Sequence, residues 1–153
     1  NEYYSASLTN LALIYREIGN VKEAIDFFKL ALLADSEAGD LENVYFSQKE
    51  LAKLYGRIDE VSSIGYFKQA LATAQTLKDD FKVALVHFES GEYYYDKGDD
   101  EKALTNFLNA KAVLKEKGDI NDENIARIDS RIKDIRMRID SVTFNLIMEK
   151  YDK

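Results

Sequence analysis

Apolar side chains recur every three or four residues along most of this chain, which is the spacing of one face of an α-helix. In the first part of the chain this stripe ends at a glycine-asparagine turn, and a second stripe begins at Val21. The first stripe consists of Leu8, Leu11, Ala12, Tyr15 and Ile18. No alternation typical of a β-strand competes with these stripes, so the pattern predicts an all-α chain.

The stripes repeat with a period of about forty residues. Tyr15, Tyr55 and Tyr94 are spaced 40 and 39 residues apart. The phenylalanines that follow them keep the same intervals, and they are Phe28, Phe67 and Phe107. A fixed period of this size predicts stacked helical hairpins that share one core, and it places these aromatic side chains inside that core.

Three hairpins are predicted, over about residues 3–38, 40–78 and 80–117. We expect the second to consist of helices over 41–57 and 60–78, and the third of helices over 80–97 and 99–117, ended by Gly118-Asp119. In the second hairpin the turn is one residue shorter, and Asp59 stands where the first has Gly19. This predicts a tighter or distorted connection, because glycine is the residue that readily adopts the left-handed helix cap.

Residues 119–153 keep helical spacing but lose the small residues of the earlier hairpins. Ser130 and Arg131 stand where small residues are expected, and Asp140 can cap a last helix. We interpret this tail as a degenerate pair of capping helices, with a single long helix as the alternative. Its basic row is either solvated or in contact with a neighbouring domain, and consists of Arg127, Arg131 and Arg138.

The small residues complete a resemblance to tetratricopeptide repeats over roughly residues 3–117. They are Ala12, Ala52 and Gly91 in the first helix of each hairpin, and Ala24, Ser63 and Ala103 in the second. The resemblance implies a right-handed superhelical solenoid of antiparallel helix pairs, here of about eight helices. The family's proline is missing and the period exceeds its usual 34 residues. This longer form is similar to arrays in kinesin light chains, cell-polarity scaffolds and bacterial regulators that sense peptides or sugars.

Composition narrows the classes of function. The 153 residues carry a net charge of −7, which disfavours nucleic-acid binding. With no cysteine and one histidine, His87, the sequence offers no catalytic constellation, metal site or cofactor site, so we predict no enzyme. No apolar run reaches the roughly 20 residues of a membrane span, and we expect a cytoplasmic protein. Because the sequence begins at Asn1, we expect a piece of a longer chain.

The resemblance implies that the first helix of each hairpin lines a concave, partner-binding face. The candidate binding residues are Leu13 and Arg16 in the first hairpin, Phe46, Lys49, Lys53 and Arg57 in the second, and Phe88, Glu92 and Tyr95 in the third. Lys49, Lys53 and Arg57 are spaced four residues apart and predict one basic stripe. Such a stripe suits an acidic peptide or a C-terminal carboxylate, unless Glu42 and Glu50 neutralise it. Thr9 and Leu13 replace the lysine and asparagine of the family's two-carboxylate clamp.

These observations favour a scaffold or adaptor that binds a partner peptide or helix. The alternative is the sensory or regulatory region of a larger signalling or transcription-regulating protein that responds to a peptide or small ligand. The sequence also leaves open a self-association through the ends of the array.

Overall fold

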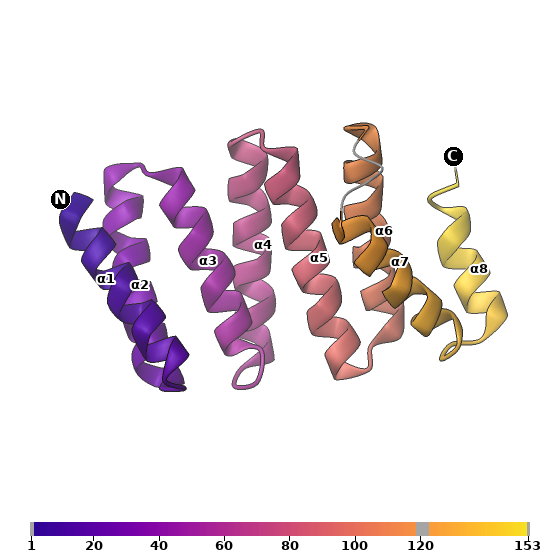
Figure 1. Cartoon of the computed structure of the whole chain (residues 1–153), viewed down its shortest axis with the longest axis horizontal. Coiled ribbons are helices and arrows are strands. Elements are labelled where there is room, and N and C mark those ends of the chain that lie inside the picture. Colours follow the sequence, from indigo (N-terminus) through magenta and orange to yellow (C-terminus); the bar gives the residue numbers. More distant parts are fainter. Residues whose placement is uncertain (1, 119–122, 153) are drawn as a thin grey trace. The chain divides into compact units, whose positions relative to one another are not determined.

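The computed structural model describes residues 2–118 and 123–152, and within them the chain is all-α (Figure 1). The helices are α1 (Glu2–Glu17), α2 (Val21–Ala38), α3 (Leu41–Tyr55), α4 (Glu60–Thr76), α5 (Asp80–Lys97), α6 (Asp100–Glu116), α7 (Glu123–Arg136) and α8 (Ser141–Glu149). The predicted all-α fold of about eight helices is therefore confirmed for the described residues. Asp119, part of the predicted end of the third hairpin, lies outside them.

The chain divides into two compact units, Asn1–Lys78 and Asp79–Lys153. In unit 1, each of the helices α1 to α4 packs against the next one along the chain. In unit 2, α5 packs against α6, and α6 packs in turn against α7 and α8. Each unit is described by itself, and the handedness of a superhelix through the whole chain stays a prediction.

The small residues lie where the helices of a hairpin approach each other. Ala12, Ala24 and Ala52 are fully buried in unit 1, and so is Ser63, whose hydroxyl donates to the Ala52 carbonyl oxygen at 2.7 Å. In unit 2, Gly91 lies against the buried ring of Phe107. The predicted close approach of paired helices at these positions is confirmed.

The aromatic anchors differ from one another in burial. Phe28, Phe67 and Phe107 are buried, as predicted. The anchor tyrosines are only half-buried and lie at the edges of the cores, where Tyr15 stacks on Phe27 and Tyr55 on Tyr66, with ring centroids 5.4 and 5.7 Å apart. Leu11 and Ile18 of the first stripe are exposed rather than buried.

One backbone hydrogen bond recurs in all three hairpins and ties each turn to its anchor tyrosine. The residue that caps the second helix donates its N–H to the tyrosine carbonyl: Asn20 to Tyr15 (2.8 Å), Asp59 to Tyr55 (2.9 Å) and Asp99 to Tyr94 (3.0 Å). This bond spans five residues in the first and third hairpins and four in the second. The missing residue of the second hairpin is therefore removed from within this loop.

The predicted tighter connection in the second hairpin is wrong in one respect. The helix α3 ends at Tyr55 rather than at residue 57, so residues 56–59 separate the two helices and the segment is longer than in the first hairpin. Gly56 keeps right-handed backbone angles (φ −53°), whereas Gly19 and Gly98 are left-handed. Asp59 begins α4 by accepting hydrogen bonds from the backbone of Val61 and Ser62. The helix start thus replaces the glycine-capped helix end.

The tail forms two helices rather than one. Asp140 accepts a hydrogen bond from the Thr143 backbone at 2.8 Å and so caps α8, as predicted. Four tail side chains share a buried cluster with Phe107 and Leu104 of α6, and they are Ile125, Ile128, Ile135 and Phe144. The tail therefore completes the core of unit 2.

Candidate functional site

In unit 1, the candidate site is organised around a buried carboxylate on α3. Only 3% of the Glu50 surface is exposed. Its carboxylate forms ion pairs with Arg16 of α1 and, at 3.4 Å, with Lys53 one turn further along α3. Hydrogen bonds from Glu17 first, and then from Glu50, raise the pKa of Arg16. The predicted residues Arg16 and Lys53 are thus brought together by Glu50.

The three predicted basic side chains occupy different surroundings. Lys49 is half-buried and its ammonium lies 6.0 Å from the centroid of the Tyr45 ring, within range of a cation–π contact. Lys53 is exposed on the last turn of α3. Arg57 is exposed too, but it lies in the turn after α3, so the predicted stripe extends beyond the helix. Because the only acidic residue of the segment 49–57 is the buried Glu50, the charge that this segment presents to solvent is positive.

The apolar candidates of unit 1 belong largely to its core. Leu13 and Phe46 are half-buried and pack against the cluster that contains Phe28 and Leu51. The Phe46 ring centroid lies 6.3 Å from that of Phe28. These two side chains therefore support the helices that carry the basic groups, and each keeps a part of its surface exposed.

In unit 2, the helix α7 covers the predicted binding residues of α5. Phe88 is 6% exposed, its ring lies 5.9 Å from that of Phe107, and the guanidinium of Arg127 lies 4.9 Å from its centroid. Glu92 accepts two hydrogen bonds from Arg131, at 2.7 and 3.0 Å. Phe88 is accordingly a core residue, and the Glu92 carboxylate already has a partner within the chain.

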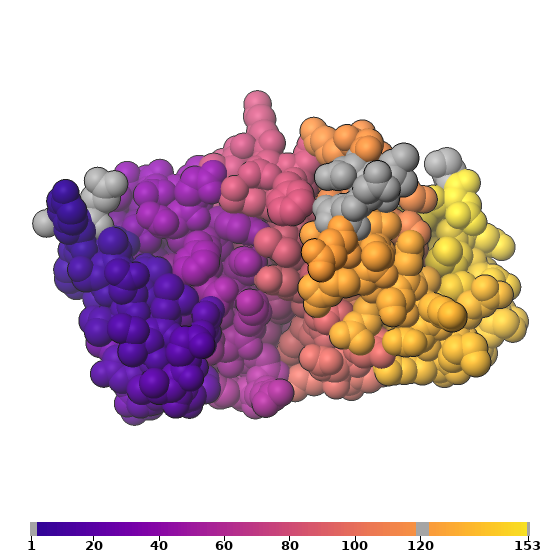
Figure 2. Space-filling view, in the orientation of Figure 1, coloured from indigo at the N-terminus to yellow at the C-terminus, as the bar shows by residue number. Residues whose placement is uncertain are grey.

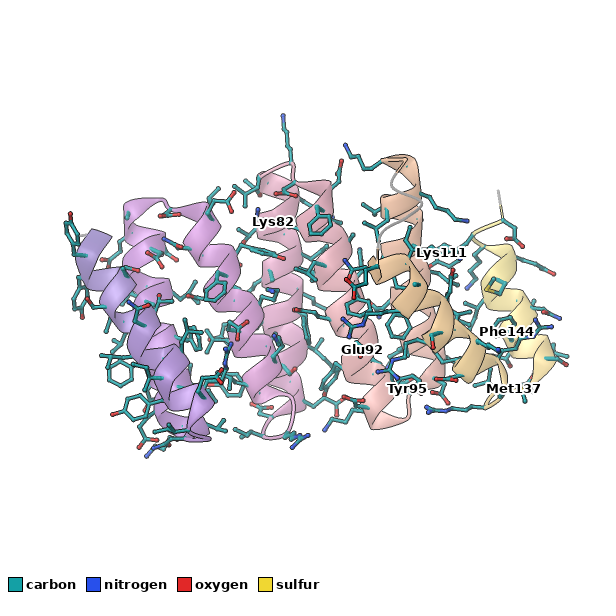
Figure 3. The ribbon with its side chains drawn as sticks, in the orientation of Figure 1. Lys82, Glu92, Tyr95, Lys111, Met137 and Phe144 are labelled. Atoms are coloured by element: carbon teal, nitrogen blue, oxygen red, sulfur yellow. The ribbon has the colours of Figure 1, made fainter. Side chains whose placement is uncertain are left out.

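Tyr95 is held between two arginines of the tail. The guanidinium groups of Arg131 and Arg138 lie 4.3 and 4.2 Å from the centre of its ring. Its hydroxyl accepts from Arg138 at 2.6 Å and lies 3.2 Å from an Asp134 carboxylate oxygen. Figure 3 shows Glu92 and Tyr95 on α5, and in Figure 2 the atoms of α7 form part of the visible face of unit 2.

The basic row of the tail therefore contacts its own chain. Arg127, Arg131 and Arg138 engage α5, and Arg138 also pairs with Asp100 at 3.2 Å. Hydrogen bonding to Glu92, more than any other influence, raises the pKa of Arg131. The sequence carries one signal for this arrangement, since Arg131 and Asp134 follow Glu92 and Tyr95 by 39 residues, the period of the array.

Other chemistry is sparse in the described part of the chain. Residues 2–118 and 123–152 contain no group of histidine, cysteine, aspartate or glutamate side chains that could hold a metal ion. None of the described helices combines the length and apolar character of a membrane-crossing segment. His87 is half-buried on α5, and desolvation lowers its pKa.

Comparison with known proteins agrees with this architecture. A family model described as a tetratricopeptide repeat matches residues 7–42, which include most of α1 and all of α2. The crystal structure of BtubC (BKLC) from P. vanneervenii is similar, with a TM-score of 0.69 and 21% sequence identity over 96% of this chain and 61% of that chain. A search of the curated proteins returns no match.

The chain is a helical-repeat protein of the tetratricopeptide type. Its likeness to BtubC, at 21% identity, shows the fold alone, and the chain spans about three fifths of the length of that protein. Tetratricopeptide repeats generally mediate protein–protein interactions and are typically scaffolds without enzymatic activity.

Proposed function

We propose that this chain is a scaffold or adaptor module, cytoplasmic in location, that binds an acidic segment of a partner protein on unit 1. The observation that carries the proposal is the sign of the exposed charge on residues 49–57. Three of these residues are basic, and their one acidic neighbour, Glu50, is buried. In a chain of net charge −7, this local reversal of sign favours an anionic partner.

Rigid support is a second reason to place the binding surface here. Arg16 and Lys53 are held by the same buried carboxylate, and Phe46 anchors α3 in the core of unit 1. Side chains that are already ordered lose less conformational entropy when a ligand binds. In unit 2 the tail arginines occupy the corresponding residues Glu92 and Tyr95, so the proposed surface consists of Lys49, Lys53, Arg57, Arg16 and the exposed part of Leu13.

The proposal is tested with a library of fluorescent acidic peptides that end in a free or an amidated carboxyl group. We expect binding that weakens with added salt and falls at least about tenfold in the variant Lys53→Glu/Arg57→Glu, since each close charge pair contributes of order 1 kcal/mol or more. A loss on amidation would identify a C-terminal carboxylate as the recognised group.

The matched control is Lys68→Glu, which changes an exposed lysine on α4 of the same unit. This variant should bind as the unchanged chain does, and circular dichroism should show the same helix content in all variants. Equal affinity in Lys53→Glu/Arg57→Glu and the unchanged chain would exclude the basic segment as the binding surface.

A further inference from the structure

The surface of α1 differs from that of every other helix in charge. The thirteen residues from Tyr3 to Tyr15 contain no charged side chain, and no other uncharged run in the sequence is as long. Yet α1 lies at the surface of unit 1 (Figure 2). Exposed helices normally carry charge, and an uncharged apolar patch at a protein surface marks an interaction site.

The exposed apolar side chains of α1 follow a heptad spacing. We name this set the α1 seam, and it consists of Tyr4, Ser7, Leu11, Ile14 and Ile18, the last in the turn directly after the helix. All five are exposed, Ile14 to 56% and Ile18 to 69%. The hydroxyl of Ser7 donates to the Tyr3 carbonyl oxygen at 2.8 Å, so the one polar side chain of the seam is satisfied within the helix. Positions that alternate three and four residues apart form the contact line of paired helices.

The next hairpin shows what this line does when it is covered. Forty residues on, the positions equivalent to Tyr4, Ser7 and Leu11 are occupied by Val44, Ser47 and Leu51 of α3. These three are buried, Leu51 completely, and α3 packs against α2. The same line of a first helix is therefore a helix-packing surface in the second hairpin and an uncovered surface in the first.

We propose that the α1 seam pairs with the α1 seam of a second copy of this chain, about a twofold axis that crosses the middle of the helix. Charge favours a second copy as the occupant. Two chains of net charge −7 repel each other wherever an acidic face meets itself. The uncharged run of α1 is a surface on which a symmetric contact brings no like charges together, and isologous twofold dimers are the commonest oligomers.

The dimer should be weak, because the seam lies on one helix of 16 residues. Such a seam buries less than the roughly 1,200 Å² of a standard stable interface. Sedimentation equilibrium of the chain from about 1 μM to about 1 mM should therefore show dissociation within that range. The mass should rise from 17.5 kDa toward twice that value. A mass of one chain at every concentration would overturn the proposal, and so would assembly beyond a dimer.

Two pairs of variants locate the contact. Ile14→Lys places a charge in the seam and should abolish the rise in mass, whereas Val61→Lys, at an 81% exposed apolar position on α4, should leave it unchanged. Because the chain has no native cysteine, a short bismaleimide reagent should link Leu11→Cys into dimers and leave Val61→Cys monomeric. A dimer that survives Ile14→Lys, or that is linked only through Val61→Cys, would show that another face pairs. None of these variants alters the basic segment of unit 1, so this proposal fails or stands independently of peptide binding.

Discussion

Single small residues determine how closely the helices of this array approach each other. At Gly91 of α5, a β-carbon would lie 2.7 Å from Cε1 and 2.8 Å from Cδ1 of the Phe107 ring. That ring is completely buried, so its neighbours leave it little room to move. Glycine is thus needed here for the space it leaves rather than for its backbone freedom.

We predict that Gly91→Ala destabilises the chain by about 1–3 kcal/mol, the usual cost of adding a methyl group to a packed core. Gly65→Ala on α4 is the matched control, because a β-carbon at Gly65 would meet no atom within 4 Å. That change should stabilise the chain by about 0.5–1 kcal/mol, since alanine is the better helix former. Urea unfolding followed by circular dichroism measures both effects. Equal effects of the two substitutions would contradict the role assigned to Gly91.

His87 gives the fold a pH dependence with a defined sign. Burial lowers the pKa of His87 from its ordinary 6.5, and a hydrogen bond with Asn106 partly opposes this shift. The unfolded chain therefore takes up the proton more readily, and the stability present above the unfolded pKa is lost as the pH falls through the folded pKa. We predict that the unchanged chain loses more stability than His87→Gln between about pH 7.5 and pH 5. Parallel stability profiles of the two proteins would contradict this prediction.

Residue patterns in the sequence predicted the small positions well and the exposure of apolar side chains less well. Ala12 and Ala24 must be small because two helices meet there, and this requirement repeats visibly along the chain. Leu11 and Ile18 continue the apolar stripe but are exposed, because α1 has no preceding helix on that side in unit 1. Periodicity identifies an apolar face without saying whether a neighbour covers it.

At the scale of helices, the position of α7 explains most of what the sequence left open about the site. The predicted binding residues Glu92 and Tyr95 were inferred from their helix alone, and both are engaged by arginines one period later. Pairing between successive first helices depends on distances between elements, which one helix does not contain. The end of α3 at Tyr55 is a similar case, because the N-cap of Asp59 fixes the start of the next helix.

The contact of Arg131 with α5 should stabilise unit 2. We predict that Arg131→Ala costs about 1–2 kcal/mol, because it removes a bidentate, partly buried pair and leaves the Glu92 carboxylate without that partner. Arg131→Lys should lie between the two, since lysine keeps the charge but loses the planar fork. Lys117→Ala is the control: it removes the exposed ion pair with Asp80 and should change stability little. Thermal unfolding measures all three, and an Arg131→Ala protein as stable as the control would contradict the prediction.

For the whole molecule, the two units each contain the parts that a stable fold requires. Unit 1 buries Phe28 and Leu51 in its own cluster, and unit 2 buries Phe107, Ile128 and Phe144 in another. Repeat arrays are stabilised by contacts between neighbouring elements, so a cut between two units removes fewer contacts than a cut within one. Residues 1–78 and 79–153, produced separately, should therefore each be helical and unfold cooperatively with heat. A piece cut within unit 2, such as residues 1–99, provides the comparison, because its α5 lacks α6. We expect α5 to be unstructured there, with helix content close to that of residues 1–78. If either unit alone gave no cooperative transition, the cores of the two units would have to depend on each other for folding.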